Sequence, residues 1–386
     1  MKVVGYAYPW DVTVPGFVER ARALGVDEVA VAVAYHSARA ATPWSAEGSA
    51  MLVEHAALYR PVREQAWAPG APRPAEPEWV ASRDSAGDAV RALGAAGIPA
   101  AAWIVLTHSS RVGAEFPELA VRNCFGETYP WALCPSQQAV REYAATVAAE
   151  CLQGLGFSSV ILEACGPLGA VHLHQHEKTD GVWAPAVARL LSICCCVACA
   201  AGWIEAGLDP ATVRATLAAE VRRLVDTGDL TITADALAPA LAATLLRTRH
   251  EGVDALRAAV LDRIDAGTRV VLHVGLDPWA TGAFPGLTPT AADDVDAVVL
   301  FNWVPGPGSA DTVAAARAQL PERVAVASYV TAVAAAAVPD IGDYVTELAK
   351  AGADELHLYH LGLAGPARWP DLQAATAAAH HGDWET

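Results

Sequence analysis

A single carboxylate, Glu163, lies near the end of an apolar run at residues 158–164. A Gly/Pro turn separates it from three histidines at alternating positions, His172, His174 and His176, and Glu177 follows them directly. A carboxyl group at the end of a buried strand suits general acid or base catalysis, because an apolar environment raises its pKa. A structural acid held in a salt bridge is the alternative interpretation.

The three histidines are expected to face one region, because alternating residues of an extended segment point to the same side. They could bind a metal ion through their ring nitrogens. Alternatively, together with Glu177, they could hydrogen-bond the hydroxyl groups of a substrate beside Glu163. Their position directly after the strand that carries Glu163 favours substrate binding.

The elements that must position these groups are eight short apolar runs separated by helical stretches. The runs cover residues 2–8, 27–36, 99–108, 158–164, 268–277, 296–303, 323–330 and 354–361. Most are preceded by a helical stretch that ends in Gly, a usual helix stop. Apolar strands alternating with helices indicate a parallel sheet covered by helices, and eight such repeats predict an α/β fold, a single (β/α)8 TIM barrel over residues 1–386. An open doubly wound sheet is the alternative, but no Gly-x-Gly-x-x-Gly turn follows the first strand.

Two segments exceed a simple barrel. Residues 37–85 form a Pro-rich excursion after the second strand, and residues 165–267 form a helical insertion between the fourth and fifth strands. Each could cover a site at the barrel mouth, and each could equally be a separately folded subdomain.

Polar and aromatic residues gather at the ends of the predicted strands, which is where TIM barrels carry their chemistry. A core has no need of so many polar groups, because unpaired buried polar groups are costly. We therefore expect a functional pocket there. Its candidate substrate-binding residues are Tyr8, Trp10, His36, His108, His172, His174, His176, Glu177, His273, Asn302, Trp303, Tyr329, His357 and Tyr359.

The chain contains 12 tryptophans, and several of them flank strand ends or loops. Aromatic faces interspersed with His, Asn and carboxylate partners suit a sugar, which has apolar C–H faces and many hydroxyl groups. A nucleoside or another polar metabolite fits the same mixture.

The formal net charge of −17 argues against partners that are themselves anionic, namely nucleic acids and anionic membranes. The opening residues, "MKVVGYAYPW", do not resemble a secretory signal, and the sequence has no uninterrupted apolar run of about 18 residues outside plausible strands and helices. We therefore expect a cytoplasmic protein whose cysteines are reduced or bind metal. A homo-oligomer is compatible with the sequence.

Residues 132–166, "ALCPSQQAVREYAATVAAECLQGLGFSSVILEACG", resemble a stretch of glycoside-hydrolase-like barrels that leads into an acidic fourth strand. Residues 108–135 are similar to the segment that precedes it in those proteins. Cys194, Cys196 and Cys199 are similar to the cysteine cluster that binds a structural zinc in family 42 β-galactosidases. The resemblance implies a retaining-type sugar hydrolase with Glu163 as general acid/base, a possible structural zinc and no other required cofactor.

The cysteines at 194–199 lack an evident fourth ligand in the sequence, and Cys165 or Cys151 could supply it. Alternatively, one apolar helix over residues 188–203 could simply bury small thiols.

The chain departs from the family pattern at the strand that should carry a second glutamate. The seventh strand reads "VAVASYVTAV" without a carboxylate, and Leu162 replaces the Asn that usually precedes the strand-four acid. Asp277 is the nearest second carboxylate, and Asp11 and Glu177 are weaker candidates.

The hypothesis from the sequence is therefore an enzyme that cleaves the glycosidic bond of a small sugar conjugate through Glu163 and Asp277. Two alternatives stay open. One is a metal-dependent lyase or isomerase that uses the histidines, and the other is a non-catalytic carbohydrate-binding barrel.

Overall fold

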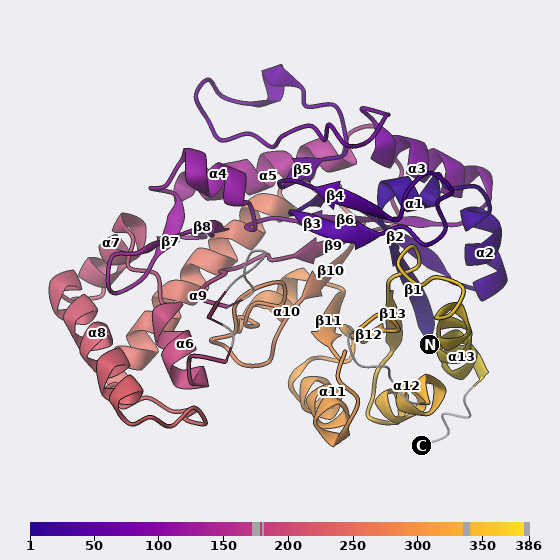
Figure 1. Cartoon of the computed structure of the whole chain (residues 1–386). Coiled ribbons are helices and arrows are strands. Elements are labelled where there is room, and N and C mark those ends of the chain that lie inside the picture. The colour runs from indigo at the N-terminus through magenta and orange to yellow at the C-terminus, as the bar shows by residue number, and fades with distance from the viewer. Residues whose placement is uncertain (172–177, 180, 335–339, 382–386) are drawn as a thin grey trace.

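The structure, a computed structural model, describes residues 1–171, 178–179, 181–334 and 340–381. Eight parallel strands form a closed barrel (Figure 1): β1 (Lys2–Ala7), β2 (Glu28–Tyr35), β6 (Ala100–Val105), β9 (Ser159–Glu163), β10 (Arg269–His273), β11 (Ala297–Phe301), β12 (Ala325–Thr331) and β13 (Glu355–Tyr359). Closure is explicit, because β1 pairs in parallel with both β13 and β2. The predicted TIM barrel is confirmed, and each of its eight strands lies within or largely overlaps a predicted apolar run.

The helices that cover the barrel are α2 (Phe17–Leu24), α3 (Ser85–Ala95), α5 (Gln138–Leu152), α11 (Pro307–Gln319), α12 (Ile341–Lys350) and α13 (Trp369–His381). Of these, α2, α3, α5 and α12 coincide with helical stretches expected before a strand. Short helices α1 (Pro9–Val12) and α4 (Ser110–Glu115) follow β1 and β6 at the carboxyl ends of the strands, whereas α10 (Ala291–Asp294) directly precedes β11. Gly25 ends α2 with a φ of 81°, a conformation that glycine adopts without strain. Asp84 caps α3 by accepting the Gly87 N–H.

The Pro-rich excursion contains β3 (Ala38–Ala41), β4 (Ala50–Val53), β5 (Ala57–Leu58) and the 3₁₀ turn η1 (Glu64–Ala66). β3 and β4 form an antiparallel pair, whereas β5 adds to the edge of β2 in the antiparallel direction. A second small antiparallel pair, β7 (Ala120–Arg122) and β8 (Thr128–Leu133), lies between β6 and β9.

The segment between β9 and β10 contains α6 (Pro185–Leu191), α7 (Val197–Glu205), α8 (Pro210–Asp226) and α9 (Pro239–Leu261). Helices α6 to α8 lie to one side of the barrel strands, at the left of Figure 1. The expectation of one helix over residues 188–203 is wrong. The chain leaves the helix at Ser192 and re-enters it at Val197, so the cysteines at 194–196 lie in the connection between α6 and α7.

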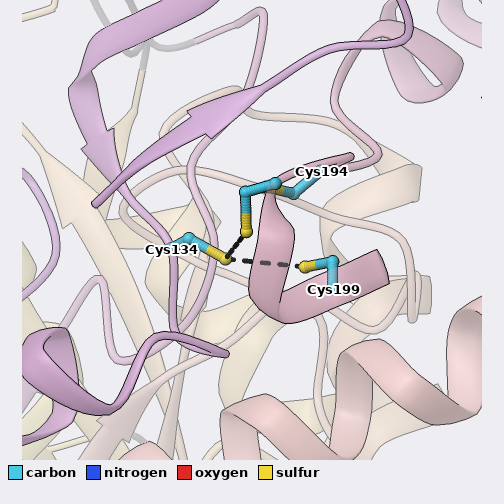
Figure 2. Close-up of side chains that lie close together, drawn as sticks. Cys134, Cys194 and Cys199 are labelled. Atoms are coloured by element: carbon cyan, nitrogen blue, oxygen red, sulfur yellow. Dashed lines mark hydrogen bonds between the residues drawn. The ribbon is translucent and has the colours of Figure 1, made fainter. Parts of the chain in front are cut away.

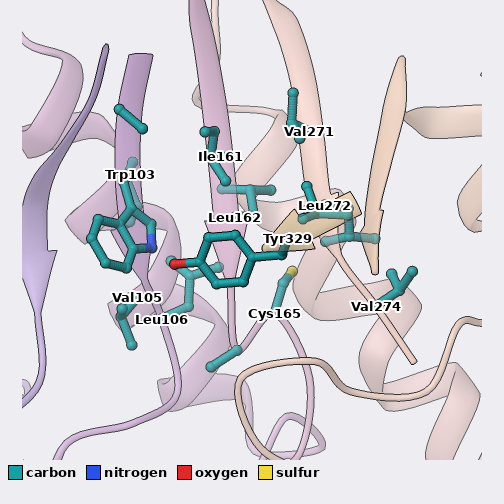
Figure 3. Close-up of a cluster of buried hydrophobic side chains, with 14 of the residues drawn as sticks. Trp103, Val105, Leu106, Ile161, Leu162, Cys165, Val271, Leu272, Val274 and Tyr329 are labelled. Carbon is teal, nitrogen blue, oxygen red and sulfur yellow. The ribbon is translucent and has the colours of Figure 1, made fainter. Parts of the chain in front are cut away.

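The barrel interior combines large polar and aromatic side chains with alanines. Tyr6 of β1 pairs in register with Ala30, and Trp103 of β6 pairs with Ala32. The ring of Tyr6 contacts Trp103, His273, Tyr329 and His357, which come from four different strands. Small neighbours therefore leave room for a bulky hydroxyl-bearing ring on the barrel axis. Figure 3 shows Trp103 and Tyr329 among the apolar side chains of β9 and β10.

Within the described residues, no helix is long and apolar enough to cross a membrane.

Candidate active site

Glu163 is the last residue of β9 and its side chain is buried. The indole N–H of Trp103, on the adjacent strand β6, donates to Glu163 Oε2 at 2.8 Å. Burial raises the pKa of Glu163 to about 7, although the hydrogen bond from Trp103 acts in the opposite direction. A carboxyl group with this pKa can donate a proton near neutral pH, as a general acid must.

An aromatic cluster surrounds this acid at the carboxyl ends of the strands. Tyr8 stacks on Trp10 with ring centroids 4.5 Å apart and lies 4.3 Å from the ring of His360. Trp303 lies 4.8 Å from the ring of Tyr359, which in turn lies 5.6 Å from Tyr329. These rings come from the β1, β11, β12 and β13 ends, so the fold brings the predicted aromatic residues to one end of the barrel.

His273 and His357 occupy the interior beneath this cluster, and both are fully buried. His273 Nδ1 lies 3.7 Å from Glu163 Oε2, and its Nε2 is 3.0 Å from the hydroxyl of Tyr6. The same hydroxyl is 2.9 Å from His357 Nδ1. Both histidines were expected to contact substrate directly. In the structure they contact Tyr6 instead, and only His273 approaches the acid.

Asp277, the expected second carboxylate, lies beyond the strand that carries His273. Asp277 is exposed in the loop after β10, where its Oδ1 accepts the Trp279 N–H at 3.0 Å. Its charge acts on Arg249 of α9. The Glu163 carboxyl group is approached instead by Trp103 Nε1 at 2.8 Å and His273 Nδ1 at 3.7 Å.

Asp11, in the short helix α1 after β1, is buried by contrast. Its Oδ2 accepts the Tyr8 N–H at 3.0 Å and lies 3.8 Å from His360 Nδ1. Burial raises the pKa of Asp11 to about 7, despite the Tyr8 N–H and the charge of Arg20. Asp11 is therefore a second buried acid at the same end of the barrel as Glu163.

Three further candidate residues, at the ends of β2, β6 and β11, differ in what their side chains contact. The half-buried ring of His36 stacks between Tyr35 and His108, with centroid separations of 4.2 and 4.5 Å. Asn302 is buried, and its Nδ2 donates to the Ser309 carbonyl in α11 at 3.3 Å. The side-chain amide of Asn302 therefore binds the helix that follows its strand. His172, His174, His176 and Glu177 lie outside the described residues.

Two residues of the site were missing from the candidates read from the sequence. Trp103 is the one large residue in the run "PAAAW", and a tryptophan beside so many alanines was the signal that could have identified it. In the structure it lies in register with Ile161 of β9. His360 is fully buried beside Tyr8, and its Nδ1 accepts the N–H groups of Gly362 and Leu363. Its Nε2 has no hydrogen-bond partner among the described residues, so it offers a donor to a ligand.

The four cysteines Cys134, Cys194, Cys196 and Cys199 form a second cluster, with all four sulfurs within 4.8 Å of one another. Figure 2 shows the side chain of Cys134 pointing toward those of the α6–α7 connection and α7. Cys134 directly follows β8. The partner strand β7 contacts the cysteines of the α6–α7 connection, because the Arg122 N–H donates to Cys194 Sγ at 3.5 Å. The expectation that Cys165 or Cys151 completes the set is wrong, because pairing of distant segments, rather than closeness in sequence, selects the fourth thiol.

The cysteine cluster fits a tetrahedral metal ion. Cys134 Sγ lies 3.6 Å from Cys199 Sγ and 3.7 Å from Cys196 Sγ. Zinc–sulfur bonds of about 2.3 Å in a tetrahedron require sulfurs about 3.8 Å apart. Gln137 Nε2 lies 3.5 Å from Cys196 Sγ and can donate to it, and the buried guanidinium of Arg249 lies near enough to act electrostatically on the thiols. In the described part of the chain, these cysteines are the one group of three or more metal-ligating side chains close enough to share an ion.

No protein-family model matches the chain, and a search of the curated proteins gave no match. Its fold is similar to that of several glycoside hydrolases of known structure. The structure matches alpha-L-fucosidase isoenzyme 2 from Paenibacillus thiaminolyticus with a TM-score of 0.56 at 12% identity, covering 98% of this chain and 49% of that one. It matches a β-galactosidase from Marinomonas ef1 with a TM-score of 0.58 at 14% identity, covering 97% and 59%.

A third match is a GH42 β-galactosidase from G. stearothermophilus, with a TM-score of 0.55 at 11% identity, covering 98% of this chain and 56% of that one. The chain therefore spans about half the length of these solved chains. The predicted resemblance to glycoside-hydrolase barrels is confirmed as a likeness of fold, and at such identities it carries no residue roles.

Proposed function

We propose that this protein is a glycosidase that cleaves the glycosidic bond of a small sugar conjugate, with Glu163 as general acid/base. The observation that carries the proposal is the burial of Glu163 at the end of the fourth strand, which raises its pKa to about 7. Glycosidic cleavage requires an acid to protonate the departing oxygen, and a buried carboxyl group that stays protonated near neutral pH meets that requirement.

The aromatic cluster supports a sugar as the ligand. The rings of Trp303 and Tyr359 are only partly buried, so they retain surface for contact with C–H faces. The indole Nε1 of Trp303 and Nε2 of His360 are buried without a partner among the described residues. Since a buried donor without a partner costs about 1–3 kcal/mol, ligand hydroxyl groups that accept from these donors would be bound favourably.

Asp277 remains our proposed second carboxylate, with Asp11 as its competitor. Asp277 is exposed and therefore reachable by water, whereas Asp11 is enclosed beside His360. The stereochemistry of the product distinguishes the possible mechanisms. A separation of about 5 Å from Glu163 allows a covalent intermediate and retention, and roughly 6.5–9.5 Å leaves room for water and inversion.

The test is hydrolysis of a panel of aryl glycosides by the wild-type protein and the Glu163→Gln, Asp277→Asn and Asp11→Asn variants, with folding checked by circular dichroism. Glu163→Gln should lower kcat/KM for a substrate with a poor leaving group by about 10²–10⁴-fold. Nuclear magnetic resonance of the first-formed anomer then reports retention or inversion. Equal turnover by wild-type protein and Glu163→Gln would refute the role of Glu163.

A carbohydrate-binding barrel without catalysis is the second candidate, and the absence of a carboxylate from β12 favours it. In that case saccharides should raise the melting temperature while no glycoside in the panel is cleaved. The third possibility, a metal-dependent lyase or isomerase, requires a metal bound outside the cysteines. A chelator-sensitive activity that persists in cysteine variants would support it.

We also propose that the four cysteines hold a structural zinc ion. Four thiolates fill the tetrahedral coordination of zinc and leave no position for a reactive water, so the ion would support the fold rather than the reaction. The bound ion would join the β7–β8 pair to the insertion between β9 and β10.

A further inference from the structure

An exposed apolar surface lies at the mouth of the barrel, at the carboxyl ends of β10 and β11. We call it the apolar wall, and it consists of Phe284, Phe301, Trp303 and Val304. Phe301 is 49% exposed and Val304 is 71% exposed, whereas Phe284 and Trp303 are half-buried. Scattered exposed apolar residues are ordinary in folded proteins, but contiguous ones mark binding surfaces.

The side chains of the apolar wall adjoin one another. The centroid of the Phe301 ring lies 5.5 Å from that of Phe284 and 5.1 Å from that of Trp303. Val304 directly follows Trp303 in the chain. Beneath them, the buried ring of Tyr329 lies 5.6 Å from Phe284 and 5.9 Å from Trp303. Phe301 is also the register partner of Tyr329, so both side chains belong to the inner face of the barrel sheet.

The apolar wall begins beside the acid. The residue after Glu163 is Ala164, and its N–H donates to the Ala283 carbonyl at 3.1 Å. Phe284 follows Ala283 in the chain, and its ring stacks on that of His273 with centroids 4.5 Å apart. His273 Nδ1 in turn lies 3.7 Å from Glu163 Oε2. From Phe284 the wall extends outward to its more exposed members.

We propose that the apolar wall binds an aromatic leaving group, which makes glycosides of phenols and aromatic alcohols the substrate class of this site. The inference rests on the proposed role of Glu163 as the acid. Glu163 gives its proton to the glycosidic oxygen, and the bond from that oxygen to the anomeric carbon breaks with its electron pair on the oxygen. A neutral alcohol departs. Water supplies a hydroxyl group to the anomeric carbon, and its other proton replaces the one that the acid gave up.

The composition of the apolar wall decides between an aromatic leaving group and a second sugar. The leaving group lies against the surface that adjoins the acid, because the proton goes to the oxygen that this group carries away. Of the wall side chains, only Trp303 has a hydrogen-bonding atom, and its Nε1 is buried. The hydroxyl groups of a second sugar would lose water there without gaining partners from the wall, which costs free energy. An aromatic ring can instead stack on Phe284 or Phe301 and cover their exposed surface.

Polar residues of the mouth lie on the other side of Glu163. Around the barrel, β10 and β11 follow β9 in one direction, whereas β6, β2 and β1 follow it in the other. Asp11 comes after β1, and its Oδ2 lies 3.8 Å from Nδ1 of His360, which follows β13. Hydroxyl groups of the sugar therefore find polar partners away from the apolar wall. The two sides of the mouth match the two parts of an aromatic glycoside.

The first test compares benzyl and methyl glycosides of one sugar. Benzyl alcohol and methanol have similar acidity, so the two substrates differ in apolar contact rather than in leaving-group ability. The wild-type protein should have a KM about tenfold lower for the benzyl glycoside. Phe301→Ala should remove this preference without raising KM for the methyl glycoside. Phe125→Ala is the matched control, because Phe125 is also an exposed ring (38%) but lies against Arg222 of α8.

The second test needs neither the correct sugar nor turnover, so it separates this inference from the proposed function. Saturation-transfer nuclear magnetic resonance measures the binding of 2-naphthol to the wild-type protein, Phe301→Ala and Phe125→Ala. Loss of binding in folded Phe301→Ala alone supports an aromatic site at the apolar wall, even if no glycoside is cleaved.

Two sets of results count against the apolar wall. Cleavage that favours disaccharides over benzyl glycosides, or an equal effect of Phe301→Ala on both glycosides, would overturn the inference and leave the glycosidase assignment intact. The inference also fails if 2-naphthol does not bind the wild-type protein, if its binding survives Phe301→Ala, or if Phe125→Ala weakens it equally.

Discussion

The indole N–H of Trp103 donates to Oε2 of Glu163 at 2.8 Å, across the parallel pair β6–β9. In register, Trp103 is the partner of Ile161, two residues before the acid, so the long indole reaches from one layer of the barrel interior to the next. It stabilises the carboxylate in a site whose burial otherwise favours the neutral acid. The balance between these two effects makes the protonation of Glu163 sensitive to single substitutions.

Trp103→Phe should raise the pKa of Glu163, because the carboxylate loses its hydrogen-bond donor while burial is preserved. Since a general acid must be protonated, the basic limb of the kcat/KM profile should move to higher pH by about one unit. Trp79→Phe is a suitable control, because Trp79 donates to Tyr59 in the excursion rather than to the acid. A kcat/KM profile that does not move along the pH axis would show that the Trp103 hydrogen bond does not stabilise the Glu163 carboxylate.

Glu163→Gln should change how stability depends on pH. The pKa of Glu163 is about 7 in the folded chain, against an ordinary value of 4.5, so the folded state holds its proton more tightly. The resulting stabilisation is complete at pH values below the unfolded pKa and is lost as pH rises through the folded pKa. The free energy of unfolding of the wild-type protein should thus fall relative to that of Glu163→Gln by up to about 3 kcal/mol between these two pH values. Urea unfolding at acidic and alkaline pH measures this difference, and a pH-independent difference would contradict it.

Cys134→Ser should abolish stoichiometric zinc and lower the melting temperature by several degrees, because metal binding that requires the folded site stabilises the fold. Elemental analysis of the purified protein should find one zinc per chain. Cys165→Ser is the matched control: Cys165 is also a buried thiol but is outside the four-sulfur group. Zinc retained by Cys134→Ser, or lost equally from both variants, would show that this cluster is not the site.

Trp303→Ala should weaken substrate binding with little effect on the chemical step. It removes an aromatic face and an unpartnered buried N–H at the mouth, both remote from proton transfer in the proposed mechanism. For a cleaved glycoside, KM should rise by about tenfold or more while kcat changes less. If the protein binds without cleaving, the same loss should be visible in saccharide titrations. A larger effect on kcat than on KM would place Trp303 in contact with the reacting atoms instead.

Much of the architecture was predictable because it depends on local patterns. Apolar runs bounded by Gly-terminated helices specified the eight strands, and the common handedness of such units closes them into a barrel. The position of Glu163 at the end of β9 followed from the same pattern. The break between α6 and α7 did not, because "ARLLSICCCVAC" contains no Gly or Pro to mark it, although the break places Cys194 near β7.

The partners within the site were not predictable from spacing. His273 and His357 were expected among groups that contact substrate, because polar residues near strand ends all look alike in a sequence. Which of them turn inward depends on the register of the whole barrel, and the register brings Tyr6 to residues 267 and 351 positions away.

The sequence by itself determined the fold, the one acid at the end of the fourth strand and the concentration of aromatic residues at the barrel mouth, because these depend on residue order along each strand. Only the tertiary structure decided that Cys134 completes the cysteine cluster, that Trp103 holds Glu163, and that Tyr6 lies between His273 and His357. Those contacts arise when strands distant in sequence are brought together by barrel closure, and no local periodicity encodes them.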